Sequence, residues 1–422
     1  MGACVLACAL VLVSAEEDIG RATRLLEAGE VAEAKALLGA IEESTQQESA
    51  QHDRQLRFLK AHLALREGDS GRAIALFRQL LSEDPTLIRV RLDLARALYE
   101  TGEFEAATYH FELALGAGIP DAVRRNVQAY LERMRYAETT ASLHAGIATD
   151  SNPGQGPRTD TINLFGLPFQ LSPAAQPKRA TALVINASGR VALGADRRSY
   201  LLASLDAREY SDSLLNYRIG QVGVGHSIPL EGWRIGAEAG GYATHFQKQT
   251  LSEGPWARAY AWGKLGPSLL LNPSLARRWS DYPSYDFLSG TQDSAALDAT
   301  LAASPSLVLS AGITFGKTGA VDPVFAFDSV ELRFGARKEV LFGLIIGARF
   351  AYARSNYQAE DPLFGGLRRD RQRRLELELS LRDFSLWGFA PTLFVSKIRN
   401  DSNFDLYAWD RELAGVGATT RF

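Results

Sequence analysis

The chain has 422 residues, enough for two domains, and its formal net charge of −3 gives no electrostatic basis for binding nucleic acid. No internal stretch approaches about 18 consecutive apolar residues, which excludes a membrane-spanning helix. A membrane β-barrel is not excluded, because its strands expose only alternate residues to lipid.

The N-terminal residues predict a secretory signal peptide. Residues 1–15 are apolar and end in Val13-Ser14-Ala15, where small residues suit a signal peptidase. Cleavage as a lipoprotein at Cys8 is the weaker interpretation, because the apolar run continues past it. Both cysteines, Cys4 and Cys8, lie in this leader. The mature chain would therefore have no disulfide and no thiolate nucleophile or metal ligand.

Residues 16–136 have the pattern of a helical repeat. Gly68, Ala73 and Phe77 recur 34 residues later as Gly102, Ala107 and Phe111, which is the period of a tetratricopeptide repeat. An earlier copy carries Gly29, Ala34 and Leu38 at the same internal spacing. Small residues at the glycine and alanine positions would let paired helices approach closely. We expect an α-helical solenoid of three repeats over residues 16–136.

From residue 137 to 422 the hydrophobic period becomes two. In Arg374 to Arg382 every second residue is leucine, with Glu376, Glu378 and Ser380 between them. A soluble β-sandwich would give the same alternation, but the signal peptide and the number of long strands favour an outer-membrane barrel. We expect fourteen antiparallel strands, near residues 141–150, 180–192, 198–210, 214–227, 233–247, 255–264, 273–284, 291–304, 306–317, 325–337, 341–357, 370–382, 388–398 and 411–422.

The segments between the strands predict the loops and the aromatic belts. The polar segments 152–177 and 358–369 are expected to be extracellular loops. Aromatic residues near strand ends are expected in interfacial girdles: Tyr210, Trp233, Trp256, Trp262, Tyr282, Tyr352 and Trp409.

The last segment predicts how the barrel is assembled. From Ala414 onward alternate residues are apolar or small, and the chain stops on Phe422. A terminal aromatic residue on an amphipathic strand is typical of outer-membrane barrels, whose last strand must close against the first. We expect Phe422 to act as the assembly signal that the barrel assembly machinery binds.

The segment from Arg91 to Ala107, followed by a barrel whose first strand runs into Ala148-Thr-Asp-Ser-Asn152, resembles the Slam family of surface lipoprotein assembly modulators, also called type XI secretion outer-membrane proteins. The resemblance covers essentially the whole mature chain, although the repeat domain is short. It implies a periplasmic repeat domain, a fourteen-stranded barrel in the outer membrane, and export of lipoproteins or soluble proteins to the cell surface. It implies as partners a client protein, outer-membrane lipid and, as a further candidate, a periplasmic chaperone.

The repeat groove is where the sequence predicts client binding. Stacked repeats form a concave surface that binds polypeptide segments. Counting from Gly68 and Gly102, the groove-facing positions are Phe58, His62, Leu65, Arg66, Leu92, Arg96, Tyr99 and Glu100. The aliphatic residues among them fit packing between repeats equally well. The client-binding prediction therefore concerns His62, Arg66, Arg96, Tyr99 and Glu100, because long polar side chains are seldom buried unpaired.

Other functions have weaker support. Ser142 and His144 would share a strand face and His226 precedes Ser227, but neither pair comes with a nucleophile elbow or an oxyanion hole. Asp281 and Asp286 lack the ligand spacing of a calcium loop. We expect no enzyme, cofactor or metal. The alternatives to protein export are a polysaccharide exporter with many aromatic residues in its lumen, and a passive porin or barrel enzyme, for which the repeats would be superfluous.

Overall fold

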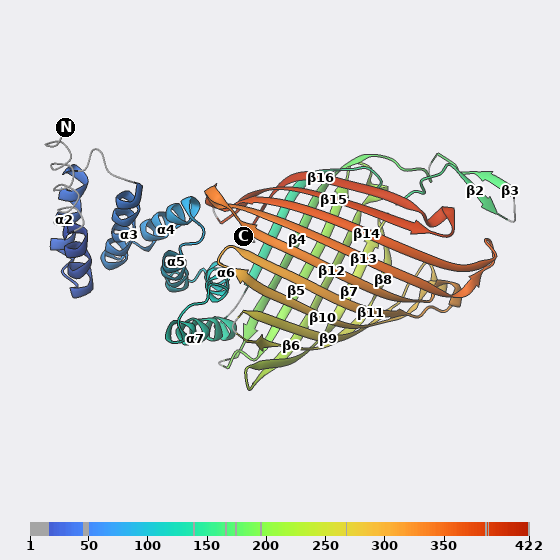
Figure 1. Ribbon diagram of the computed structural model, residues 1–422. Coiled ribbons are helices and arrows are strands. Elements are labelled where there is room, and N and C mark those ends of the chain that lie inside the picture. The colour runs from blue at the N-terminus through green and yellow to red at the C-terminus, as the bar shows by residue number, and fades with distance from the viewer. Residues whose placement is uncertain are drawn as a thin grey trace.

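The computed structural model describes residues 17–44, 50–137, 140–164, 167–173, 175–194, 196–266, 268–384, 386 and 388–420. They form a row of helices, called the arm below, and a closed β-barrel (Figure 1). The arm lies against one open end of the barrel, called the arm end, and the opposite opening is the far end. The leader and Phe422 lie outside the described residues, so the signal peptide and the assembly signal stay predictions.

The arm is built from short helices joined by tight turns. Among the described residues, its helices are residues 17–28, α2 (Val31–Ser44), α3 (Ala50–Glu67), α4 (Ser70–Glu83), α5 (Ile88–Glu100), α6 (Phe104–Leu115) and α7 (Asp121–Ala137). None of these helices is both long enough and apolar enough to cross a membrane. The alanines of the predicted repeats, Ala34, Ala73 and Ala107, are fully buried, and Leu38, Phe77 and Phe111 are at most 2% exposed.

The repeat glycines have a different role from the one that their small size suggested. Gly29, Gly68 and Gly102 have φ of +83°, +83° and +85°, the left-handed conformation that ends a helix. At each glycine a Cβ atom would find nothing within 4 Å, so close helix packing does not require glycine there. The backbone turn requires it instead, because residues with a Cβ rarely adopt this conformation.

Fourteen antiparallel strands close the barrel, and β1 pairs with β16. The structure confirms the expected architecture and strand count. The strands are β1 (Thr140–Asp150), β4 (Ala180–Leu193), β5 (Ser199–Tyr210), β6 (Tyr217–Leu230), β7 (Trp233–Phe246), β8 (Gln249–Leu265), β9 (Leu269–Ser280), β10 (Gly290–Ser304), β11 (Leu307–Thr318), β12 (Phe327–Glu339), β13 (Leu344–Asp361), β14 (Gly366–Leu381), β15 (Ala390–Ser402) and β16 (Trp409–Thr419).

Two predicted loops were wrong in part. The 358–369 segment is mostly strand, because β13 continues to Asp361 and β14 begins at Gly366, which leaves only a short turn. The 152–177 segment contains a small hairpin of β2 (Thr161–Leu164) and β3 (Leu167–Gln170), which lies beyond the far end of the barrel (Figure 1). Polar composition did not distinguish these strands from loops, because neither hairpin tip has a continuous apolar face.

The two faces of the wall follow the predicted alternation. Leu375, Leu377 and Leu379 on β14 are exposed on the outer face, whereas Glu376 and Glu378 face the interior, called the lumen below. An apolar outer face and a polar lumen suit a barrel that sits in lipid.

The aromatic girdle is smaller than predicted. Tyr210, Trp256 and Trp409 are at most 9% exposed and lie on lumen-facing positions, so they cannot form an outer belt. Trp233 and Tyr352 lie on the outer face. The alternation along a strand divides its residues between two faces. Near a strand end, however, the alternation does not show which of the two faces is the outer one.

Candidate functional site

A buried cluster of charges joins the arm to the barrel. Arg91 on α5 donates from Nη1 to Glu339 Oε2 at 2.9 Å, and Glu339 is the last residue of β12. Arg382, which directly follows β14, places Nη2 2.8 Å from Glu339 Oε1, an ion-pair distance without hydrogen-bond alignment. The three side chains are 0%, 0% and 1% exposed. We call this cluster the junction triad.

His110 on α6 completes the packing around Arg91. Its Nδ1 lies 3.0 Å from Arg91 Nη1. Burial, together with the neighbouring Arg91 and Arg382, holds the pKa of His110 well below its ordinary value. The imidazole is therefore neutral, and Nδ1 accepts a hydrogen bond from the guanidinium, which can only donate. Burial also raises the pKa of the adjacent Tyr109 to about 12, so the phenol stays protonated.

The arm contacts the rim of the barrel closely at a second point. Gly116, which ends α6, approaches Ala302 on β10 so closely that a Cβ atom on the glycine would lie 2.5 Å from the Ala302 carbonyl oxygen. Tyr109 and Glu112 on α6 line a hollow of about 290 Å³ together with lumen residues such as Arg349, Glu376 and Glu378. Helix α6 therefore lies directly over the arm-end opening of the lumen (Figure 1).

Below this opening the lumen wall carries alternating charges. Arg333 donates to Asp298 at 2.8 Å and to Glu331 at 2.6 Å. One strand further, Arg349 donates to Glu376 at 2.8 Å and lies 3.6 Å from Glu378. These side chains are between 30% and 60% exposed, so they remain hydrated and can exchange partners with a passing chain.

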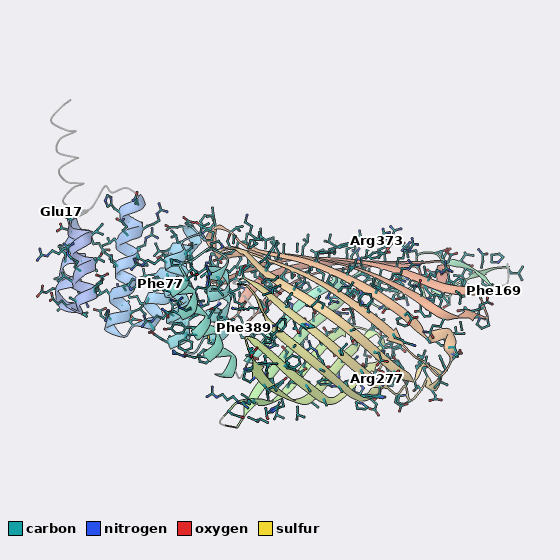
Figure 2. The ribbon with its side chains drawn as sticks, turned by 60° about the horizontal axis from the view of Figure 1, so that its bottom comes forward. Glu17, Phe77, Phe169, Arg277, Arg373 and Phe389 are labelled. Carbon is teal, nitrogen blue, oxygen red and sulfur yellow. The ribbon has the colours of Figure 1, made fainter. Side chains whose placement is uncertain are left out.

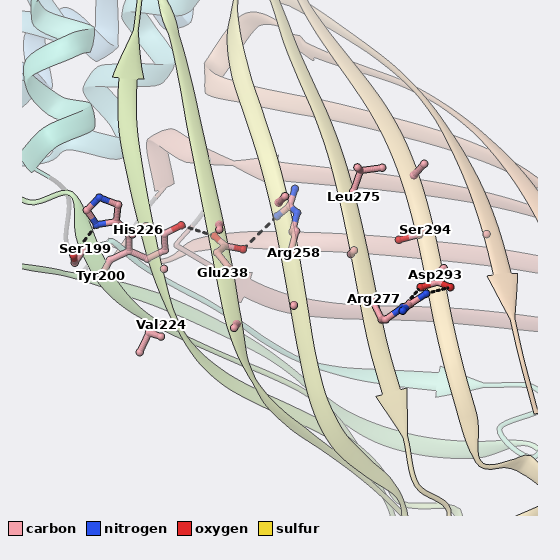
Figure 3. A pocket seen from close by; sticks show the side chains of 18 of the residues that line it. Ser199, Tyr200, Val224, His226, Glu238, Arg258, Leu275, Arg277, Asp293 and Ser294 are labelled. Carbon is pink, nitrogen blue, oxygen red and sulfur yellow. Dashed lines mark hydrogen bonds and ion pairs between the residues drawn. The ribbon is translucent and has the colours of Figure 1, made fainter.

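The opposite wall is aromatic, but guanidinium groups lie over its rings. The Tyr200 hydroxyl is 2.7 Å from Glu238 Oε1, and Arg258 lies near Glu238 (Figure 3). The Tyr200 hydroxyl is also 2.7 Å from the Tyr260 hydroxyl. The Arg190 guanidinium lies 3.4 Å from the centre of the Tyr200 ring. Arg278 lies 4.3 Å from the centre of the Tyr242 ring. Cation–π contacts thus occupy these ring faces.

Two of the five predicted client-binding residues pack inside the arm. His62 places Nε2 3.1 Å from Asp93 Oδ2 and lies edge-on to Phe58 and Phe77. Tyr99 is half-buried and lies 4.9 Å, between ring centres, from Tyr130. These contacts join neighbouring helices, and a client role for His62 and Tyr99 stays a prediction.

The other three are at the surface of the arm. Arg96 is 64% exposed and donates to Glu100 at 2.9 Å, one helical turn along α5. Arg66 is exposed on α3 and has no side-chain partner within the described part of the chain. The structure therefore leaves Arg66, Arg96 and Glu100 accessible to a client.

The arm also has a groove that the sequence only partly predicted. Its volume is about 510 Å³, and Ile19, Phe58, Leu87 and Arg89 line it. The Arg89 guanidinium lies 5.5 Å from the centre of the Phe58 ring. Phe58 was among the groove-facing positions, but Arg89 was missed because it begins a helix one repeat later. The groove offers an apolar floor with a cation at its edge.

The candidate catalytic pairs are not assembled. Ser142 Oγ lies 2.6 Å from Ser188 Oγ, and His144 packs edge-on against Phe394. His226 Nδ1 is bonded to Ser199 at 2.9 Å rather than to its neighbour Ser227. Over the residues that the structure describes, no group of three His, Cys, Asp or Glu side chains is placed to hold a metal ion.

Two family models match the chain. The model described as surface lipoprotein assembly modifier, N-terminal TPR repeats, matches residues 24–111, and the model described as surface lipoprotein assembly modifier matches residues 264–422. A surface lipoprotein assembly modifier of Moraxella catarrhalis is 24% identical over 365 residues, which are 82% of this chain and 69% of that protein. Surface lipoprotein assembly modifier 1 of Neisseria meningitidis serogroup B is 26% identical over 131 residues, 30% of this chain and 27% of that protein.

Solved outer-membrane proteins are similar to about two thirds of the chain. A loop-deletion mutant of OmpT from Vibrio cholerae covers 67% of this chain with 98% of its own length, at 8% identity and a TM-score of 0.34. A bacterial polysaccharide outer membrane secretin has the same coverage, 14% identity and a TM-score of 0.37. Similarities this low carry no argument about function.

Proposed function

The chain belongs to the surface lipoprotein assembly modifier family, and from that membership we propose that it is the outer-membrane translocator of its client: the arm binds a lipoprotein or a secreted protein in the periplasm and passes it through the barrel to the cell surface. The family is one of surface lipoprotein assembly and not of enzymes, and a closed fourteen-stranded barrel belongs in the outer membrane. The arm end is then the periplasmic end.

The position of α6 over the lumen is the observation that carries this proposal. The junction triad fixes the arm at the rim, and Tyr109 and Glu112 share a hollow with lumen residues. A polypeptide held in the arm would therefore be delivered to the barrel opening and not to bulk periplasm. The proposed energy source is client binding followed by client folding outside.

The charged lumen suits an unfolded polypeptide. Hydrated ion pairs such as Arg349–Glu376 present both charges, so side chains of either sign meet a partner without a deep binding site. A polysaccharide exporter needs open aromatic faces for sugar stacking, whereas Arg190 and Arg278 occupy the faces of Tyr200 and Tyr242. A passive porin has no use for an arm held over its opening.

Charge reversal of two exposed arm residues tests the receptor role. In Arg66→Glu/Arg96→Glu we expect surface display of the client to fall by about tenfold, equivalent to about 1.4 kcal/mol of lost binding. Both arginines are exposed on the helices that the repeat pattern assigns to the groove, and reversal repels an acidic client segment. Client exposure is measured by protease shaving of intact cells.

Arg72→Glu/Arg125→Glu is the matched control, since both residues are exposed on other helices, α4 and α7. Barrel insertion, followed by heat-modifiable gel migration, should be normal in both variants. Equal display in the two variants, or display that survives deletion of residues 17–136, would show that the arm is not the client receptor.

A further inference from the structure

An arginine-rich patch lies on the outer face of β13–β15, toward the far end of the barrel. Arg369, Arg371 and Arg373 follow the same alternation as the exposed Leu375, Leu377 and Leu379, so they point away from the lumen. Arg354 on β13 and Arg399 on β15 share this face. Figure 2 places Arg373 at the outer edge of the wall. We call Arg354, Arg369, Arg371 and Arg373 the arginine patch.

The strand register sets like charges opposite one another in this patch. Arg354 pairs directly with Arg371, and Arg373 pairs directly with Arg399, while Asp401 lies opposite Arg371 on its β15 side. Directly opposed side chains have Cβ atoms about 4.5–5.5 Å apart, and like charges in such positions destabilise a sheet. An anion between the guanidinium groups would turn this repulsion into attraction.

Carboxylates flank the patch on both sides. On β12, Asp328 lies two positions before the residue that pairs with Arg354 and accepts from Gln358 Nε2 at 3.5 Å, and on β15 Asp401 is shared among several arginines. Asp401 lies 2.7 Å from Arg158, 3.0 Å from Arg399 and 3.8 Å from Arg373. Lys397 forms an ion pair with Glu412, and Arg158 and Arg399 also lie within ion-pair distance of Asp410. Glu360 lies nearer the β13–β14 turn.

The arginines of the patch form few hydrogen bonds or ion pairs with other side chains. Among the described residues, the side chains of Arg369 and Arg371 have none, and Arg354 reaches only the amide oxygen of Asn356, at 3.2 Å. The patch therefore keeps an excess of positive charge on the outer face.

The surface between the patch and the arm end is apolar apart from Lys397, which pairs with Glu412. Phe350 is 42% exposed, Leu375 46% and Leu377 47%, and Val395 continues the same surface on β15. A cationic site above an apolar wall matches an amphiphile that has a phosphate head and acyl chains. Arginine suits the phosphate, because its planar guanidinium can donate two parallel hydrogen bonds.

We infer that the arginine patch binds the phosphate groups of an acylated, phosphorylated glycolipid of the outer leaflet, whose acyl chains lie along the apolar surface of β13–β15. Other arginines on the outer wall differ from those of the patch, because each of them has a carboxylate partner. Arg277 on β9 is held by Asp293 at 2.5 Å, and Arg218 on β6 by Glu209. These arginines already have a counterion and need no lipid phosphate, as Figure 3 shows for Arg277 and Asp293.

Native mass spectrometry of the full chain in detergent tests this site. The probes are bisphosphorylated lipid A, the same lipid without phosphates, and inorganic phosphate. We expect the wild type to bind the dephosphorylated lipid at least about tenfold more weakly, because charge-assisted hydrogen bonds are lost. We expect Arg354→Gln/Arg371→Gln/Arg373→Gln to weaken binding of bisphosphorylated lipid A by about tenfold as well. Millimolar inorganic phosphate should not displace the lipid.

The matched control is Arg218→Gln/Arg277→Gln/Lys317→Gln, which removes three outward cations from other strands and should bind lipid A as the wild type does. If the patch variant fails to insert, Arg371→Gln alone replaces it. Unchanged binding by the patch variant, equal binding of the dephosphorylated lipid, or full displacement by inorganic phosphate would each overturn the proposal. None of these results depends on client export.

Discussion

Glu339→Gln should release the arm from the barrel. The substitution removes the carboxylate to which Arg91 donates and which lies 2.8 Å from Arg382, and breaking a buried pair in this way costs about 3–5 kcal/mol. We expect faster hydrogen exchange in α5 and α6 and faster proteolytic cleavage between the arm and β1. Client display should fall with it, since an undocked arm no longer faces the lumen.

Two further variants isolate the cause. Glu376→Gln removes a lumen carboxylate that also accepts from an arginine at 2.8 Å, but this glutamate is 31% exposed and the arm should stay docked. Glu339→Gln/Arg382→Met also removes one of the two cations that face the Glu339 carboxylate and should recover part of the docking. Wild-type exchange in α5 and α6 of the Glu339→Gln protein would contradict a stabilising junction triad.

Asp150→Ala should have the second largest effect, by weakening the closure of the barrel. Asp150 is fully buried at the far end of β1 and accepts from Arg411 of β16 at 2.5 Å and from the Tyr210 hydroxyl of β5 at 2.6 Å. Its removal leaves the buried Arg411 without a carboxylate, at a cost of about 3–5 kcal/mol. The temperature at which the folded band converts to the unfolded band in heat-modifiable electrophoresis should fall.

Asp293→Ala is the control for this prediction. Asp293 also binds an arginine at 2.5 Å, but on the exposed outer face, where screening makes such pairs weak. Its conversion temperature should stay close to that of the wild type. Equal shifts in the two variants would mean that burial at the closing seam is not what stabilises this end.

The fold was predictable because the 34-residue repeat of the arm and the two-residue alternation of the strands can both be recognised within short stretches of the sequence. Gly68 and Gly102 mark the same turn one repeat apart, and the leucines between Arg374 and Arg382 identify an outer face without any knowledge of neighbouring strands. The sequence did not predict the tips of β13 and β14 or the β2–β3 hairpin as strands. Pairing with a partner strand stabilises them, and their composition does not show it.

The functional surfaces were less predictable because they join distant residues. Arg91 and Glu339 are 248 positions apart in the chain, and neither belongs to a motif. The opposition of Arg354 and Arg371 depends on strand register, which the sequence does not give. His62 and Tyr99 were predicted as groove residues, but they pack between helices, because the repeat pattern specifies a helix face and not the depth of a side chain in it.

Site-specific photo-crosslinking in living cells tests the proposed path most directly. A photoreactive residue is placed at Phe58 in the arm groove, at Ser310 on the lumen wall, or at Leu377 on the outer face. Translocation through the barrel predicts client crosslinks from Phe58 and Ser310 and none from Leu377 while the client is being displayed. Client display without any crosslink from Ser310 would contradict passage through the lumen.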